Sequence, residues 1–220
     1  MISTGNDIVA LGSVNKQRAN EARFYSKVLA VSEQMLYQQP EFAEIPFENY
    51  LWLLWSVKES AYKYLKRILP DLIFSPVKTI ITNINTPAGQ SINTDNMEWE
   101  GTESTAVFYN GTVAFDIYQL YFRSIICDKW ISTVVNDTEG FENVYWGTHS
   151  VNDKSYNHQS EAVRNFAIGK LNLHIAGILK INKTPAGYPI ILNDKKESQI
   201  PLSLAHHDHF VAYSFKLNSL

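Results

Sequence analysis

Glu59 and Lys63 place a carboxylate and an ammonium four residues apart in a strongly patterned apolar segment. The segment follows Pro46 and predicts one helix to about residue 69, in which positions four apart share a face. An exposed pair of this kind is common and stabilises a helix by about 0.3–0.5 kcal/mol. Trp52 and Trp55 lie close to the same face. Because large aromatic side chains are seldom left to water without a reason, a binding face is the second interpretation.

Asp7 stands two residues after Gly5, at the start of a strand pattern over residues 5–11. Glycine allows the backbone to turn tightly there or to admit a ligand closely. The carboxylate could therefore accept hydrogen bonds from nearby backbone amides in a turn, or it could act as a ligand. The residues alone leave both interpretations open.

His206, His207 and His209 flank Asp208 near the end of the chain and offer metal-ligand chemistry. Side chains so close together on a turn point in divergent directions, and the sequence shows no second ligand cluster. We therefore disfavour a metal site here. One of these histidines as a phosphate ligand is easier to defend.

The composition is typical of a soluble globular protein, with 220 residues, 45% hydrophobic and 19% charged, and fits one large domain or two small ones. A net charge of -3 argues against a general nucleic-acid binder, which would carry a concentrated excess of Lys and Arg. The single cysteine, Cys127, fits a reducing compartment. No apolar run approaches the ~18 residues that span a bilayer. We expect a cytoplasmic protein that does not enter membranes.

The region between the first strand and the long helix is the most basic in the chain. Residues 20–37 predict a helix whose apolar stripe holds Phe24, Val28, Val31 and Met35. Its basic residues form either a solvated helix face or a docking surface for an acidic partner, where complementary charge would speed encounter. These basic residues include Arg18, Arg23 and Lys27.

Strand patterns dominate the rest of the first part of the chain. A polar stretch at 83–96 predicts a loop or insertion, and Asn110-Gly111 between two strand patterns predicts a hairpin turn. The polar region at 136–159 marks an internal boundary, followed by a helix at 160–179. The predicted strands are 74–81, 97–99, 105–109, 112–122, 125–135, 190–192 and two within 200–215.

Three separated motifs, taken together, resemble the signatures of the 4'-phosphopantetheinyl transferases. They are Gly5-Asn-Asp7-Ile-Val, then Trp55-Ser-Val-Lys58-Glu59-Ser-Ala-Tyr-Lys63, then Gly187-Tyr188-Pro189 with Ser203-Leu-Ala-His206. The W-x-x-K-E-[AS]-x-x-K element is the specific one, and the other two would be weak alone. The motif order is similar to that of the holo-acyl-carrier-protein synthase type, whereas the length is closer to the surfactin-synthetase-type enzymes.

This resemblance implies an α+β fold in which two similar halves pack as an intramolecular pseudo-dimer. We place the first half at residues 1–136 and the second at residues 137–220. A helix followed by strands in each part makes such a duplication plausible. The resemblance therefore implies that one chain supplies both sides of the active site and acts as a monomer.

The resemblance also implies a reaction, the Mg2+-dependent transfer of 4'-phosphopantetheine from coenzyme A to a serine of an apo acyl carrier protein, with release of 3',5'-ADP. Asp7 and Glu59 match the family's metal ligands, and Lys63 matches a residue that reaches the diphosphate. Glu59 could also accept the serine proton, directly or through a metal-bound water. Val9 stands where the longer enzymes often carry a second acid, which favours a two-carboxylate site.

The coenzyme A contacts that the resemblance implies are less complete. His206 matches the family's phosphate-contacting histidine, but Ala205 replaces the serine before it and Tyr188 replaces the lysine between Gly and Pro. Lys183, near the same turn, is a substitute charge. Lys58 matches the motif but points about 100° away from Glu59 on the helix, so we retain it only as a candidate phosphate contact.

The family's carrier proteins are acidic and are met by basic residues on the first helix, so the resemblance makes Arg18, Arg23 and Lys27 the candidate docking face. Fatty-acid, polyketide and peptide synthetase carriers share the acidic helix and the serine, so the sequence does not choose among them. The competing hypothesis is a catalytically silent module of the same fold that binds coenzyme A or a carrier protein. Ala205 and Tyr188 are the residues that favour it.

Overall fold

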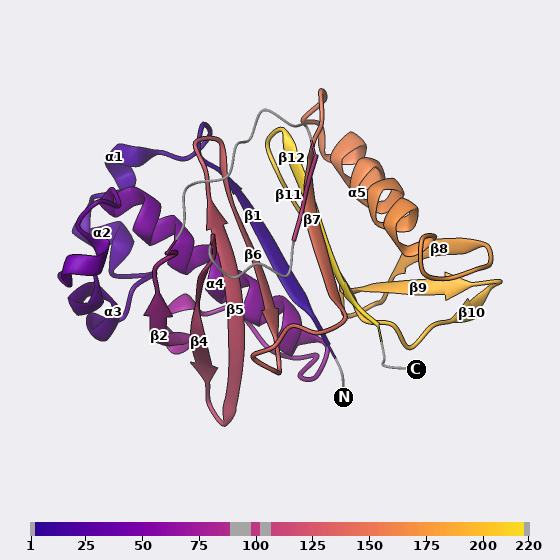
Figure 1. The fold of residues 1–220 in the computed structure, drawn as a ribbon, viewed down its shortest axis with the longest axis horizontal. Coiled ribbons are helices and arrows are strands. Elements are labelled where there is room, and N and C mark those ends of the chain that lie inside the picture. Colours follow the sequence, from indigo (N-terminus) through magenta and orange to yellow (C-terminus); the bar gives the residue numbers. More distant parts are fainter. Residues whose placement is uncertain (1–2, 89–97, 102–106, 218–220) are drawn as a thin grey trace.

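The computed structural model describes residues 3–88, 98–101 and 107–217 and contains two long helices and three antiparallel sheets (Figure 1). This mixture of helices and sheets confirms the predicted α+β class. The helices are α1 (Lys16–Ala19), α2 (Ala22–Tyr25), α3 (Val31–Leu36), α4 (Phe47–Lys66) and α5 (Tyr156–Leu171), with 3-10 turns η1 (Pro40–Phe42) and η2 (Pro76–Lys78).

The strands form sheets of five, four and three members. The first sheet has the order β1-β6-β5-β4-β2, the second β11-β12-β7-β3 and the third β10-β9-β8. Their bounds are β1 (Gly5–Ala10), β2 (Ile80–Asn85), β3 (Glu98–Glu100), β4 (Tyr109–Phe115), β5 (Tyr118–Ile126), β6 (Trp130–Asn136), β7 (Val144–Ser150), β8 (Leu179–Lys183), β9 (Pro189–Asn193), β10 (Lys196–Glu197), β11 (Leu202–His207) and β12 (Phe210–Lys216).

Helix α4 packs across one face of the first sheet, mainly on β1 and β6, and passes behind the strands in Figure 1. Five apolar residues at helical spacing are buried on one face of α4, which confirms the helical period over this segment. Ser56, on the opposite side of the helix, is also buried, so the helix is covered on more than one side. The five buried apolar residues are Tyr50, Leu54, Val57, Ala61 and Leu65.

Helix α5 covers the second sheet in a similar way, packing on β11 and β12. Val163, Ala167 and Leu171 are buried there at helical spacing, which confirms a helix in this region, although it begins and ends earlier than the predicted range of 160–179. The two long helices lie on the two sides of the molecule, and β1 and β11 run between them (Figure 1). Residues far apart in the sequence therefore meet along these two strands.

Side chains, and not a backbone ladder, join β1 to β11. The amide of Asn6 donates to Ser203 Oγ at 3.1 Å, and the amide of Ala10 donates to His207 Nδ1 at 3.1 Å. Each strand is the edge of its own sheet, so these bonds satisfy amides that would otherwise lack a partner. These two hydrogen bonds fix the second sheet against β1, the strand that carries Asp7.

The two parts of the chain repeat one order of elements. In each, a first strand precedes the long helix and pairs antiparallel with the last strand of that part: β1 with β6, and β7 with β12. The last two strands of each part also form a hairpin, β5–β6 and β11–β12. One strand crosses this division, because β3 comes from the first part and pairs with β7 of the second.

Several sequence predictions about local structure were wrong. The predicted hairpin turn at Asn110-Gly111 lies inside β4, where β2 approaches Gly111 too closely for a Cβ. The chain reverses instead at Asp116, whose φ of 51° suits a two-residue turn between paired Phe115 and Tyr118. The predicted strand at 125–135 is divided between β5 and β6, and the polar region at 136–159 contains β7, a central strand of the second sheet.

The predicted helix at 20–37 is also wrong, because this segment contains two short helices, α2 and α3, and α1 precedes it. Val31 and Met35, expected on a buried stripe, are 73% and 67% exposed. The period of the apolar residues matched a helix by chance, since the chain turns after α2 at residues 26–30.

Parts of three further predictions lie outside the described residues. These are residues 89–96 of the predicted polar stretch, residue 97 of one predicted strand and residues 105–106 of another. Residues 98–100 form β3, and Tyr109 begins β4. Among the helices of the described ranges, none combines the length and apolar character needed to cross a bilayer.

Gly5→Ala tests the close packing of β1 on α4. A Cβ at Gly5 would collide with the backbone oxygen of Ser60 and the amide of Tyr64, so the helix must move away from the strand. We expect a loss of about 1–3 kcal/mol in the free energy of unfolding, measured by urea denaturation. Gly12→Ala is the control, because open space surrounds Gly12. Equal stability of the two variants would contradict this account.

Candidate active site

Asp7, Glu59 and Lys63 meet where β1 packs on α4. Lys63 Nζ lies 2.9 Å from Asp7 Oδ1 and 3.4 Å from Glu59 Oε1. The helix places Glu59 and Lys63 on one face, and the alternation of β1 turns Asp7 toward the same face. One ammonium therefore bridges two carboxylates that are 52 residues apart in the sequence.

Burial dominates the electrostatics of Asp7, whose side chain is 7% exposed. Burial raises the pKa of Asp7 to about 6; Lys63 lowers it in part, and the nearby Glu59 raises it again. Burial also lowers the pKa of Lys63, but Asp7 and Glu59 more than offset this, and the net pKa lies above its ordinary value of 10.5. Lys63 therefore stays an ammonium at neutral pH, while Asp7 titrates near neutrality.

Glu59 is the more open of the two carboxylates, with its side chain 30% exposed. Trp55 Nε1 donates to Glu59 Oε2 at 3.0 Å, which fixes the direction of the carboxylate. The Trp55 ring in turn packs edge-on against Phe74, with 5.3 Å between ring centroids. The aromatic side chains near Glu59 are partly buried, and Trp55 has a structural role because it orients a carboxylate that remains partly exposed.

The site fits a magnesium ion by the chemistry of its donors. Magnesium takes oxygen ligands, and proteins commonly supply one or two carboxylates while water and substrate phosphates complete its shell. Asp7 and Glu59 supply two carboxylates around one point, and the ammonium of Lys63 lies between them. Within the described ranges, no group of three or more acidic, histidine or cysteine side chains forms a fuller protein cage.

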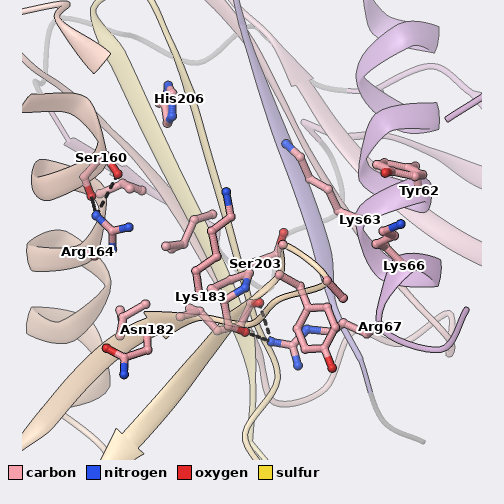
Figure 2. A pocket seen from close by; sticks show the side chains of 18 of the residues that line it. Tyr62, Lys63, Lys66, Arg67, Ser160, Arg164, Asn182, Lys183, Ser203 and His206 are labelled. Atoms are coloured by element: carbon pink, nitrogen blue, oxygen red, sulfur yellow. Dashed lines mark hydrogen bonds between the residues drawn. The ribbon is translucent and has the colours of Figure 1, made fainter. Parts of the chain in front are cut away.

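A basic pocket of about 340 Å3 opens beside Lys63, between α4 and α5. Figure 2 shows Lys63 and Lys66 on the α4 side, Arg164 on the α5 side and Lys183 between them. No acidic side chain of the described residues lines this pocket. The five cations and one histidine that line it are Lys63, Lys66, Arg67, Arg164, Lys183 and His206. Such a surplus of positive charge suits a ligand with several phosphates.

Arg67 supports the floor of the pocket from the end of α4. Its guanidinium donates to Leu202 O at 2.9 Å and also to Pro189 O. The guanidinium carbon lies 5.0 Å from the ring centroid of Tyr188, in cation–π geometry. Tyr188 therefore lines the pocket as predicted, but as the partner of an arginine, and it holds the 184–188 turn in place.

His206 faces the pocket, where its ring meets Tyr156 edge-on at 5.4 Å. Burial, together with Lys63, His207 and other cations, lowers the pKa of His206, so the ring is neutral at pH 7 in the absence of a ligand. The other two histidines point elsewhere. His207 binds the amide of Ala10, and His209 Nδ1 lies 3.1 Å from Val151 O.

Two predicted cofactor contacts lie away from this pocket. Ala205 alternates with His206 on β11 and is buried against Ile8 and Trp130 in the core between the sheets. Lys58 is fully buried and paired with Glu33 at 2.6 Å. The structure therefore corrects both assignments, because neither side chain reaches the surface that Lys63 and His206 line.

The sequence reasoning missed Lys66, Arg67, Tyr156, Ser160 and Arg164, all of which line the pocket. Lys66 and Arg67 had a readable signal, since they follow Lys63 within one turn of the same helix. Arg164 had none, because it lies on α5 in no recognisable motif and reaches the pocket only through the packing of α5 on β11. Arg164 Nη1 donates to Ser160 Oγ at 2.8 Å, which directs the guanidinium.

The candidate docking residues are exposed and lie apart from the pocket. Arg18 belongs to α1, Arg23 belongs to α2 and Lys27 follows α2, so they belong to a folded segment and not to a single helix. Arg18 is held over the ring of Phe24, with 4.7 Å between guanidinium carbon and ring centroid. The prediction of a carrier contact at these residues stays a prediction.

A family model described as the 4'-phosphopantetheinyl transferase superfamily matches residues 3–112, which is half of the chain. The match includes Asp7 of β1 and Glu59 and Lys63 in the C-terminal half of α4. It stops before α5, β8 and β11, which supply the other wall of the pocket. Neither a curated protein nor a solved structure matched this chain.

Asp7→Asn tests the energetic cost of the buried carboxylate. Because the folded pKa of Asp7, about 6, exceeds the ordinary value of 3.8, its ionisation destabilises the folded state as pH rises between these values. The neutral amide removes this cost. We expect the melting temperature of the variant to equal that of the wild type near pH 3.8, to exceed it increasingly up to pH 6 and to stay higher above it. A constant difference across this range would contradict the assignment.

Proposed function

Because this chain belongs to the 4'-phosphopantetheinyl transferase superfamily, we propose that it transfers the 4'-phosphopantetheine arm of coenzyme A to a serine of an apo carrier protein. The observation that carries the proposal is the meeting of Asp7 and Glu59 at Lys63, which itself lines a basic pocket. The acids and the cation have the chemistry that a diphosphate displacement needs. The pocket beside them has the charge that coenzyme A needs.

In the proposed reaction, the serine oxygen attacks the phosphorus that bears the pantetheine arm. A new serine O–P bond forms, and the bond from this phosphorus to the ADP oxygen breaks. Glu59 is the more exposed of the two acids and accepts the serine proton, directly or through water. Lys63 stabilises the charge that develops on the departing phosphate, and its raised pKa keeps it charged for this role.

Asp7 and Glu59 would hold a magnesium ion. When bound, the ion would neutralise the charge of the diphosphate. Lys63 lies between the two carboxylates in the absence of substrate, so binding of the ion and the diphosphate would shift its ammonium toward the phosphates. Burial disfavours the ionised form of Asp7, so a cation held beside this carboxylate would stabilise its charge.

The second wall of the pocket supplies cations where the family motif residues are absent. Tyr188 and Ala205 replace two phosphate donors of the family, but Lys183 on β8 and Arg164 on α5 line the same pocket. His206 adds a neutral ring that can donate a hydrogen bond to a phosphate. These three residues make phosphate binding compatible with a sequence that lacks the usual donors.

We further propose that the chain is a monomer built as a pseudo-dimer, with halves at residues 1–136 and 137–220. The repeated order of elements supports this, because β1 and β7 occupy equivalent places before α4 and α5. The carrier would be acidic and would dock on the exposed residues Arg18, Arg23 and Lys27. The two halves would then have separate tasks. The first half would hold the two acids, and residues of the second half would complete the nucleotide pocket.

Glu59→Gln tests the transfer. Incubation with coenzyme A, Mg2+ and a panel of apo carriers, followed by mass spectrometry of the carrier, should show the pantetheine arm added by the wild type. We expect the rate to fall by about 10²–10⁴-fold in the variant, because the amide cannot accept a proton. Glu48→Gln, near the other end of α4, is the matched control. Binding of coenzyme A without transfer to any carrier by the wild type would favour the silent binding module instead.

Lys183→Gln tests the second wall of the pocket. Loss of one charge-assisted contact to a phosphate should weaken coenzyme A binding about tenfold, as measured by calorimetry. Lys180→Gln is the control, because Lys180 lies on the same strand, is exposed and does not line the pocket. Equal affinities of the two variants would show that β8 does not contact the nucleotide.

A further inference from the structure

Lys58 and Glu33 form a fully buried ion pair that the proposed chemistry does not use. Both side chains are 0% exposed, and Lys58 Nζ lies 2.6 Å from Glu33 Oε2. A buried charge is unfavourable unless it is paired and its hydrogen-bonding groups are satisfied. The contacts around this pair show how its burial is compensated.

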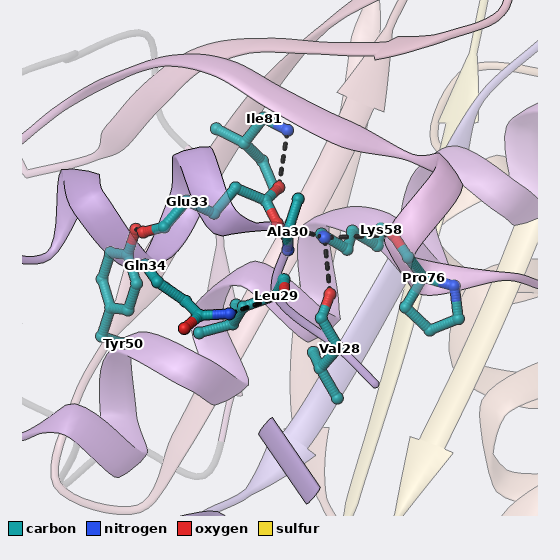
Figure 3. A network of polar contacts seen from close by, with 9 residues as sticks. All are labelled: Val28, Leu29, Ala30, Glu33, Gln34, Tyr50, Lys58, Pro76 and Ile81. Carbon is teal, nitrogen blue, oxygen red and sulfur yellow. Dashed lines mark hydrogen bonds and ion pairs between the residues drawn. The ribbon is translucent and has the colours of Figure 1, made fainter. Parts of the chain in front are cut away.

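Lys58 uses all three of its donors. Its ammonium contacts Val28 O at 2.7 Å, Glu33 Oε2 at 2.6 Å and Pro76 O at 3.0 Å, as Figure 3 shows. Burial lowers the pKa of Lys58 below its ordinary value, and the carboxylate of Glu33 offsets this only in part. The side chain is thus committed to three fixed partners from three parts of the chain.

Glu33 extends the same network on the other side (Figure 3). Its Oε2 accepts from the amide of Ala30 and its Oε1 accepts from the amide of Ile81, each at 2.8 Å. Its backbone oxygen accepts from the Tyr50 hydroxyl at 2.6 Å. Through Lys58 and Tyr50 the network therefore ties α4 to α3, to the residues before α3, to η2 and to β2.

Helix α3 has few apolar anchors of its own. Glu33 is its buried residue, whereas Val31 and Met35 are largely exposed. Hydrogen bonds depend steeply on distance and angle, so a polar anchor defines position more closely than sliding apolar contacts do. The ion pair thus sets where this segment lies against α4.

The two ends of the network lead to two proposed functional surfaces. Lys58 directly precedes Glu59, and Val28 directly follows Lys27 of the basic segment. No described residue between 18 and 36 lines the basic pocket, so this network does not reach the nucleotide site. The network thus connects Glu59 to the basic segment proposed to bind the carrier, and it does not contact the pocket proposed to bind coenzyme A.

We propose that Glu33 and Lys58 are positioning residues, which hold the basic segment of Arg18, Arg23 and Lys27 at a fixed place relative to Glu59. This inference rests on the proposed function. A carrier docked on that segment would present its serine at Glu59 only if the spacing between the two surfaces is maintained. Small displacements of a reacting group can lower rates on the order of 100-fold.

The double variant Glu33→Leu with Lys58→Met tests the proposal. It replaces the pair by apolar side chains, which often keeps or raises stability, whereas a single change would leave an unpaired buried charge. We expect kcat/KM for the apo carrier to fall about 10–100-fold, with the KM for coenzyme A within about twofold of the wild type. Asp137→Asn is the control, because it removes a different ion pair, with Lys216 at 2.7 Å.

If the ion pair served only the stability of the fold, its replacement would not lower transfer to the carrier selectively. If the double variant melts like the wild type and also transfers to the carrier like the wild type, the positioning role is overturned. Equal losses in kcat/KM for the carrier and for coenzyme A would also overturn the positioning role, because they would indicate general damage to the fold.

Hydrogen exchange separates this inference from the proposed function. In the substrate-free protein, amides of residues 16–36 should exchange faster in the double variant, while those of α5 should be unchanged. Unchanged exchange at 16–36 would overturn the positioning role whatever the transfer activity. A wild type without transfer to any carrier would instead overturn the proposed function, and its exchange data would still report whether the pair fixes the segment.

Discussion

The close packing of β1 on α4 is the contact on which the proposed active site depends. Gly5 allows the strand to approach the backbone of Ser60, and this approach brings Asp7 into reach of Lys63. The same approach buries Asp7 and raises its pKa to about 6, so the acid is held at a cost to folding. Stability and the proposed role of Asp7 thus oppose each other at this residue, which is common where a charged group must be pre-positioned.

Two buried or partly buried lysines on one helix have contrasting surroundings. Lys63 has two carboxylate partners and remains 24% exposed, which suits the exchange of partners that the proposed reaction requires. Lys58 has three fixed partners and no exposure. Five residues apart in sequence, one lysine is suited to chemistry and the other to architecture, and the surrounding hydrogen bonds decide which.

The sequence predicted the parts of the site that one regular element determines. Helical periodicity placed Glu59 and Lys63 on one face, and the motif resemblance added Asp7 and His206. The sequence prediction failed where tertiary packing decides the surroundings of a residue. Lys58 lies on the predicted helix, but its partner Glu33 comes from a segment whose helix boundaries were predicted wrongly. Arg164 was missed because only the packing of α5 on β11 brings it to the pocket.

The short strand β3 makes the two parts of the chain depend on each other for folding. It comes from the first part of the sequence, yet it covers the edge of β7, and Lys170 of α5 forms ion pairs with its Glu98 and Glu100. A polypeptide cut near residue 136 would leave β7 with an open edge that readily adds foreign strands. The halves would therefore be complementing fragments, each incomplete until the other supplies its missing surface, and not autonomous folding units.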